Sequence, residues 1–372
     1  MTKYKFDEIA INSTQKKKPT EEDKVYYIGL EHIDPGCFDV VRWGSNVAPT
    51  GDKLLMQKGD VLFGKRRAYQ RKVAIAPFDG IFSAHGMVLR PNLKVIDANY
   101  FPFFISSDKF METAVRISVG GLSPTINWKD LARQEFELPS LDEQKVLADK
   151  LWAAYRLKEA YKKLLVATDE MVKSQFIEMF GNCKSQGTLS SLCATFIDGD
   201  WIESKDQSDN GIRLIQTGNV GFGFFKGRED KSRYITEETF KKLNCTEVVP
   251  GDILISRLPD PIGRACIVPE GIGKAITAVD CTIVRLNATL LPEFLISFSK
   301  TALYASQINK IKTGTTRLRV SRGNLGNVII PIPPIESQHH FAAIAQQADK
   351  SKFELKQSIE HIDKVIKSLI NG

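Results

Sequence analysis

A short segment that opens a helix occurs twice in the chain, and this repeat constrains the fold more than any other feature. Residues 139–144 read Pro-Ser-Leu-Asp-Glu-Gln, and residues 333–338, 194 positions later, read Pro-Pro-Ile-Glu-Ser-Gln. Each copy follows a short apolar strand pattern and precedes a long run without glycine or proline. An internal repeat of this kind indicates two similar halves, each a globular block followed by a long helix.

The repeat predicts an α+β fold with an internal pseudo-two-fold. We expect two globular mixed α/β domains separated by two long antiparallel helices that form a coiled coil. The expected segments are a first domain (1–139), a central helix (140–181), a second domain (182–333) and a C-terminal helix (334–372). A chain of 372 residues is also long enough for two domains.

Apolar residues at alternating spacings of four and three predict a heptad seam on each helix. The seam of the second helix comprises Phe341, Ala345, Ala348, Lys352, Leu355, Ile359, Ile362, Ile366 and Leu369. Subtracting 194 gives Leu147, Leu151, Ala154, Lys158, Tyr161, Leu165, Thr168, Val172 and Gln175. Because an isolated helix gains little stability by itself, the seams predict that the helices pair with each other. The alternative is that each helix packs only on its own domain.

Composition favours a soluble protein with a moderate preference for polyanions. The net charge is +7 and the pI is near 8.9, which fits nucleic-acid binding and also an ordinary slightly basic protein. No cysteine pair has the spacing of a zinc site, so no metal is expected. The N-terminus is polar, and no window approaches about 18 uninterrupted apolar residues, so we expect a cytoplasmic protein without a membrane partner.

Catalytic motifs are weak throughout the sequence. Gly221-Phe222-Gly223 does not complete a dinucleotide-binding pattern and is better interpreted as a hairpin turn. Gly271-Ile272-Gly273-Lys274 lacks the P-loop spacing, and no Asp/Asn-Pro-Pro-aromatic motif of an amino-methyltransferase occurs. His85, His339 and His340 have no matching nucleophile and are interpreted as core or surface residues. We therefore predict no catalytic residue in this chain.

Basic loops after each glycine-aspartate strand start predict contact with DNA. Basic side chains neutralise phosphates, and arginine, asparagine and glutamine can also read base edges. In the first half the candidates are Lys65, Arg66, Arg67, Tyr69, Arg71 and Lys72, followed by Thr125 and Asn127 in a later loop. In the second half they are Arg257, Arg264, Thr315, Thr316, Arg317, Arg319 and Arg322. The alternative for the basic run 65–72 is a solvated hairpin.

With these motifs the chain resembles, over its whole length, the specificity subunit of type I restriction-modification enzymes. The resemblance rests on the two Pro-x-x-x-x-Gln helix openings, the half-to-half repeat and the glycine loop before each helix. It also rests on the strand starts Gly59-Asp60-Val61-Leu62 and Gly251-Asp252-Ile253-Leu254. The loop at 119–122, Val-Gly-Gly-Leu, departs from the Gly-Thr/Ser pattern that the family often has there.

The resemblance implies that the two globular blocks are target-recognition domains for a bipartite double-stranded DNA site. The helices would set the spacer and bind two methyltransferase subunits, and restriction/translocase subunits would join for cleavage. Methylation at adenine N6 with S-adenosylmethionine would belong to the partner, so no cofactor is expected in this chain. Because the blocks differ in sequence, the target should be asymmetric. The alternatives are a coiled-coil scaffold, a DNA-binding protein without a methyltransferase partner, and a nuclease or methyltransferase acting alone.

Overall fold

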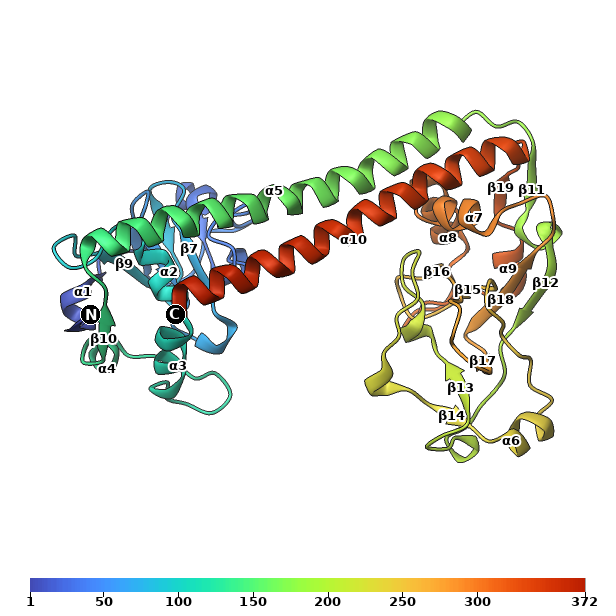
Figure 1. Ribbon diagram of the computed structural model, residues 1–372, viewed down its shortest axis with the longest axis horizontal. Coiled ribbons are helices and arrows are strands. Elements are labelled where there is room, and N and C mark those ends of the chain that lie inside the picture. Colours follow the sequence, from blue (N-terminus) through green and yellow to red (C-terminus); the bar gives the residue numbers. More distant parts are fainter. Residues whose placement is uncertain (372) are drawn as a thin grey trace. The chain divides into compact units, whose positions relative to one another are not determined.

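The computed structural model describes residues 1–371 and shows a chain that folds into two compact units (Figure 1). The first unit contains Met1–Lys163 and the residues from Leu355 onward, and the second contains Leu164–Glu354. Each unit therefore combines one globular block with segments of both long helices, α5 (Leu141–Phe180) and α10 (Ile335–Asn371). The sequence-based division instead gave each helix a segment of its own, and that division stays a prediction.

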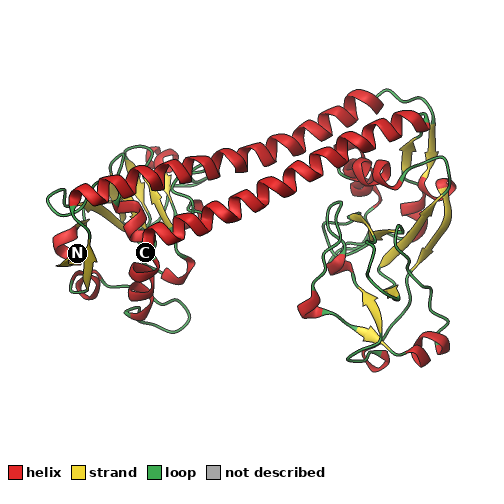
Figure 2. Cartoon of the chain, viewed as in Figure 1, coloured by secondary structure: helices red, strands yellow, loops and turns green. Residues whose placement is uncertain are grey.

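The first block is built from short strands and helices in a mixed α/β arrangement (Figure 2). Its elements are β1 (Thr2–Lys5), α1 (Phe6–Ile9), β2 (Ala10–Ser13), β3 (Lys16–Lys17), β4 (Tyr27–Ile28), β5 (Lys53–Met56), β6 (Val61–Phe63), β7 (Val73–Ile75), β8 (Gly80–Phe82), β9 (Met87–Pro91), α2 (Phe101–Ser106), α3 (Asp108–Arg116), α4 (Trp128–Ala132) and β10 (Glu135–Leu138). The strands form sheets of order β2-β9-β6-β7 and β3-β5-β8-β4, and β1 pairs with β10.

The second block repeats one four-stranded sheet and the terminal strand pair of the first, whereas its other sheet, β14-β13-β17, has three strands. Its elements are β11 (Gln186–Thr188), β12 (Cys193–Asp198), β13 (Ile212–Ile215), β14 (Tyr234–Ile235), α6 (Glu237–Lys242), β15 (Ile253–Ser256), β16 (Ala265–Ile267), β17 (Ala275–Thr277), β18 (Cys281–Leu286), α7 (Pro292–Ser299), α8 (Ala302–Ile311), α9 (Arg322–Gly326) and β19 (Ile329–Pro331). The sheet β12-β18-β15-β16 matches β2-β9-β6-β7 strand for strand, and β11 pairs with β19 as β1 pairs with β10. The predicted α+β class and internal repeat are confirmed.

The glycine-aspartate strand start is a structural clamp. Gly59 has φ +91°, in the left-handed region that glycine adopts without strain. The carboxylate of Asp60 is buried. It accepts hydrogen bonds from Nε and Nη2 of Arg90, on the neighbouring strand β9, at 2.7 and 2.9 Å. Asp252 and Arg285 repeat the arrangement at 2.7 and 3.0 Å. The repeated Gly-Asp motif therefore fixes a turn and joins two strands in each block.

The glutamine of each helix opening ties the helix to its block. Gln144 is fully buried, and its side-chain amide donates to the carbonyls of Val95 and Pro139 at 3.1 and 2.9 Å. Its carbonyl accepts the backbone N–H of Asp97 at 2.8 Å. Gln338 makes the same three contacts 194 residues later. The Pro-x-x-x-x-Gln repeat is thus conserved between the halves as a buried hydrogen-bond connector.

Replacing Gln144 with Leu should destabilise the first unit by about 1–3 kcal/mol, because three buried backbone groups lose their partner. Urea unfolding of the full chain measures the change. Gln357→Leu on the exposed face of α10 is the matched control, and it should stay within about 0.5 kcal/mol of the wild type. Equal effects of the two substitutions would show that the connector contributes nothing.

Each unit holds part of the pairing between the two long helices. In the first unit Lys158 of α5 contacts Asp363 of α10 at 3.0 Å. In the second unit Lys352 of α10 contacts Asp169 of α5 at 2.8 Å. The two lysines are 194 residues apart, as are the two aspartates, so these ion pairs are one contact repeated by the pseudo-two-fold. Their order along the chain makes the helices antiparallel, as predicted.

Every predicted seam residue is buried or half-buried. The helices also enter the hydrophobic cores of the blocks. In the first unit Leu151 of α5 and Ile366 of α10 belong to the same apolar cluster. In the second unit the ring of Phe176 lies tilted against Phe294 and edge-on to Phe341, with ring centroids 5.0 and 5.2 Å apart. Pairing between the helices therefore occurs together with packing of each helix on the blocks.

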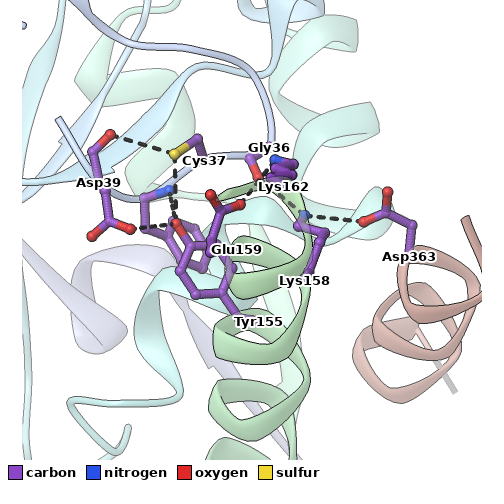
Figure 3. Close-up of polar contacts among 9 residues, drawn as sticks. Gly36, Cys37, Asp39, Tyr155, Lys158, Glu159, Lys162 and Asp363 are labelled. Atoms are coloured by element: carbon purple, nitrogen blue, oxygen red, sulfur yellow. Dashed lines mark hydrogen bonds and ion pairs between the residues drawn. The ribbon is translucent and has the colours of Figure 1, made fainter. Parts of the chain in front are cut away.

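Tyr155 anchors the loop before residue 40 to α5 (Figure 3). Its hydroxyl accepts the backbone N–H of Phe38 at 2.9 Å and lies 3.1 Å from Oδ2 of Asp39. One turn further, the ammonium of Lys158 donates to the carbonyl of Gly36 at 3.3 Å as well as to Asp363. Burial raises the pKa of the Tyr155 phenol, so this hydroxyl keeps its proton. The seam lysine thus joins the loop, α5 and α10.

Candidate nucleic-acid interface

The two predicted loops of the first block lie against each other. The backbone N–H of Ile126 donates to the carbonyl of Lys65 at 3.1 Å, and the N–H of Arg67 donates to the carbonyl of Pro124 at 2.7 Å. The guanidinium of Arg67 donates to Oγ of Ser123 at 3.1 Å. The basic run after β6 and the glycine loop 119–125 therefore form one surface.

The first-block candidates differ in how free their side chains are. Arg67, Tyr69 and Asn127 are exposed, and Lys65, Arg66 and Thr125 are half-buried. The side chains of the other two are held by contacts within the protein, although Arg71 is itself exposed. Arg71 pairs with Asp108 at 2.6 Å, and the ammonium of Lys72 donates to the carbonyl of Leu30 at 2.6 Å. These contacts of Arg71 and Lys72 join separate segments of the first block. Their contact with DNA stays a prediction.

The glycine loop of the second block has the same backbone form as that of the first. Thr313 and Arg319 exchange two backbone hydrogen bonds of 2.9 Å, as Val119 and Thr125 do at 3.0 and 2.9 Å. The loop between them is exposed, and its predicted residues are Thr315, Thr316, Arg317 and Arg319. Arg322, at the start of α9, is also exposed. The loop at 119–125 therefore keeps the geometry although its sequence departs from the Gly-Thr pattern.

Arg257 and Arg264 lie inside the second block. The guanidinium of Arg257 donates to the carbonyls of Val279 and Val320 at 2.6 and 3.1 Å, and it pairs with Asp198. Nη2 of Arg264 donates to the carbonyl of Thr217 at 3.2 Å. These bonds hold neighbouring loops together, so the structure does not bring Arg257 to the surface with Arg317 and Arg319.

A polar pocket of about 430 Å³ opens beside Arg264. Arg228 and Arg317 line it, together with Asp280 and Gln216. Sequence reasoning missed Arg228, which follows Gly227 in a loop without a recognisable motif. Three arginines from three separate loops and one aspartate line the pocket, and arginine can bind phosphate or base edges.

His85 is a second residue that sequence reasoning did not assign to the site. Its Nε2 lies 3.4 Å from Nη1 of Arg66, and its backbone carbonyl accepts the N–H of Arg66 at 3.1 Å. Burial lowers the pKa of His85, and the charges of Arg66, Lys65 and Lys53 lower it further. No sequence pattern identifies this contact, because it depends on the pairing of β6 with β9.

Exposed aromatic side chains accompany the basic loops of the second block. Phe222 and Phe224 lie in a hairpin closed by Val220 and Phe225, which confirms the interpretation of this segment as a hairpin turn. The ammonium of Lys226 lies 5.8 Å from the ring centre of Phe224. Aromatic rings beside cations can stack on bases while the cations contact phosphates.

Within residues 1–371, no three His, Cys, Asp or Glu side chains are placed to hold a metal ion. In the same part of the chain, no helix is long and apolar enough to cross a membrane. The cysteines described there are free thiols. Burial raises the pKa of Cys266 to about 12, so this thiol is protonated at neutral pH.

Comparison with known proteins gives one consistent family. The family model described as the type I restriction modification DNA specificity domain matches residues 3–165 and 187–363, one match in each half. The EcoKI specificity subunit of Escherichia coli K12 is 19% identical, with 94% of this chain and 82% of that protein covered. The MjaVIII specificity subunit of Methanocaldococcus jannaschii is 21% identical, with 95% and 88% covered.

Solved structures agree with the fold. A chain from a study of complex assembly and conformational transition of the type I restriction-modification system has a TM-score of 0.62 at 18% identity, with 99% of this chain and 96% of that chain covered. The S subunit of a type I restriction-modification system from M. genitalium has a TM-score of 0.56 at 14% identity, with 99% of this chain and 94% of that chain covered. Since the family model matches both halves, the chain belongs to the type I restriction modification DNA specificity family.

Proposed function

We propose that each globular block reads one half of a bipartite double-stranded DNA site and that the paired helices set the separation of the halves. One observation carries this proposal: the same scaffold occurs twice and presents different side chains. The order of one four-stranded sheet, the clamp, the glutamine connector and the glycine loop are repeated. A repeated scaffold with two different surfaces fits two recognition tasks of one kind.

The differences lie where base or phosphate contact is expected. Thr125 of the first glycine loop corresponds to Arg319 of the second, and Val119 corresponds to Thr313. An arginine can donate two hydrogen bonds to guanine, whereas a threonine makes single contacts or touches a thymine methyl group. Because equivalent positions carry different groups, the two half-sites should differ, and the full site should be asymmetric.

We further propose that the helices dock two adenine-N6 methyltransferase subunits. Large apolar side chains remain exposed along both helices, and these are Val146, Leu157, Leu164, Val166, Met171, Ile177, Phe353 and Val365. Exposed apolar surface on a helix is typical of a protein interface. S-adenosylmethionine would bind the partner, restriction/translocase subunits would join for cleavage, and the complex would work in the cytoplasm.

The double variant Arg66→Ala/Arg67→Ala should weaken binding to duplex DNA by roughly tenfold and lower the log–log salt slope by about one to two, because phosphate contacts are lost. Fluorescence anisotropy across a salt series measures both effects. Co-purification with the methyltransferase should be unchanged, since the side-chain contacts of these arginines go to His85 and Ser123 of the first block.

Arg116→Ala/Lys129→Ala is the matched control, because it removes two exposed positive charges from the same block. It should leave the affinity within about twofold of the wild type. If both double variants weakened DNA binding equally, the loss of affinity would be explained by the lower net charge alone. Failure of the Arg66/Arg67 variant to assemble with the methyltransferase would show that the loop is structural. The absence of salt-dependent DNA binding by the wild-type chain would favour a scaffold that does not touch DNA.

A further inference from the structure

Three nitrogen-bearing side chains lie close together in the first block without a carboxylate among them. Lys65 and Arg66 follow β6, and His85 lies in the turn between β8 and β9. The turn is held by a hydrogen bond from the N–H of Gly86 to the carbonyl of Ser83 at 3.0 Å. The backbone bond between Arg66 and His85 then fixes the two side chains at 3.4 Å from each other.

The charges that face this cluster are all positive. Lys65, Arg66 and Lys53 of β5 act on His85, and Lys16 of β3 acts on Lys65. The ammonium of Lys53 is held by the carbonyls of Thr50 and Gly51. Lys53, Lys65 and Arg66 take part in none of the ion pairs found within residues 1–371. Like charges without a counter-ion repel one another, and a bound anion removes this cost.

The contact between Arg66 and His85 also defines the protonation state of the free protein. A guanidinium can only donate a hydrogen bond, so Nε2 of His85 must accept and carry no proton. A protonated imidazole would lose this bond and repel Arg66. An anion between the two groups would instead favour the protonated imidazole, because it can accept hydrogen bonds from the guanidinium and from a protonated Nε2 together.

The second block lacks this arrangement. The turn 278–281 matches 83–86, with the N–H of Cys281 donating to the carbonyl of Ala278 at 2.9 Å. Asp280 occupies the position of His85, and its carbonyl accepts the N–H of Arg257 at 2.9 Å. The guanidinium of Arg257 is neutralised by Asp198. The scaffold is therefore shared, but only the first block leaves its cations at this turn unpaired.

We propose that Lys65, Arg66 and His85 form a binding site for one phosphate of the DNA backbone. This inference rests on the proposed DNA recognition and adds a residue and a regulation to it. When the phosphate binds, His85 takes up one proton from solvent at Nε2 and donates it in a hydrogen bond to a phosphate oxygen. Lys65 and Arg66 supply the remaining positive charge. DNA binding is thereby coupled to the uptake of one proton.

The direction of the pH dependence follows from this coupling. The pKa of His85 lies below its usual value in the free protein and rises when the phosphate is present. Affinity is therefore highest at low pH and falls as pH rises through the pKa of the bound state. A single coupled proton changes the affinity by at most about tenfold per pH unit.

The test uses the full chain and a short mixed-sequence DNA duplex at constant ionic strength, with anisotropy as the readout. The wild type should bind about five- to tenfold more tightly near pH 6 than near pH 8. His85→Gln should bind at both pH values as weakly as the wild type does near pH 8. His85→Lys should bind at both as tightly as the wild type does near pH 6. His340→Gln, an exposed histidine of α10, should behave as the wild type.

Each outcome has a definite meaning. Wild-type affinity that does not change with pH, or a pH dependence that survives His85→Gln, overturns the phosphate site and leaves the proposed DNA recognition standing. A His85→Lys variant that binds weakly at every pH while keeping the wild-type thermal unfolding also overturns it. If the wild type shows no salt-dependent DNA binding, the proposed function itself is overturned, and the phosphate site with it.

Discussion

Replacing Asp252 with Ala should destabilise the second unit by about 2–4 kcal/mol, because it removes one partner of a mostly buried ion pair. The side chain of Asp252 is nearly inaccessible, whereas that of Arg285 is about one third exposed, so water offsets part of the loss. The carboxylate also accepts the backbone N–H of Val249 at 2.9 Å, and this turn would lose its cap. Urea unfolding monitored by circular dichroism measures the change.

Two comparisons separate the parts of this effect. Asp252→Ala/Arg285→Met should cost less than the two single substitutions added together, because no unpaired charge is left behind. Glu237→Ala removes an exposed partner of Lys274 from the same block and should cost less than about 1 kcal/mol. The clamp would be unimportant if Asp252→Ala were no more harmful than Glu237→Ala.

The clamp illustrates what a repeated motif can and cannot indicate. The sequence identified Gly59-Asp60 and Gly251-Asp252 as strand starts, because a local turn needs these residue types. The arginine partners lie about 30 residues further along the chain and depend on strand pairing. The same holds for Gln144, whose position at a helix opening was evident but whose buried contact with Val95 and Asp97 was not. Local geometry was predictable, and partners brought together by the sheet were not.

The helices were the most predictable part of the fold, because a heptad seam is a local property of the sequence. Lys158 and Lys352 were recognised as equivalent positions, and each forms an ion pair with an aspartate of the other helix. Trp152 and Tyr155 were missed as core residues, since they lie beside the seam and face the first block instead. A seam predicts which face of a helix meets another helix, but it does not indicate which face meets a domain.

Basic composition located the candidate loops but could not indicate the direction of each side chain. Arg71 and Arg257 lie in the same loops as Arg67 and Arg264, and they form ion pairs with aspartates distant in sequence. His85 shows the opposite case, a residue without a motif that folding places beside Arg66. Charge patterns therefore selected candidate loops, whose contact with DNA stays a prediction, whereas the paired and unpaired cations within them could be separated only with the structure in hand.

Removing one facing heptad from each long helix should shift the preferred separation of the two DNA half-sites by about three base pairs. Deleting residues 160–166 and 355–361 shortens each helix by about 10 Å, and one base pair spans about 3.4 Å. The two ion pairs between the helices, Lys158–Asp363 and Lys352–Asp169, are kept because their residues lie outside the deleted segments. Mapping methylated adenines in the host genome by single-molecule sequencing would show which spacing is used.

Deleting residues 160–166 alone is the control for this experiment. The shortened α5 could then form either the Lys158–Asp363 ion pair or the Lys352–Asp169 ion pair with the full-length α10, but not both. Pairing should be lost over part of the helices, and methylation should disappear at every spacing. If the chain shortened in both helices still directed methylation to the original spacing, the helices would not act as the spacer, and the separation of half-sites would have to be set by the recognition blocks or by the methyltransferase.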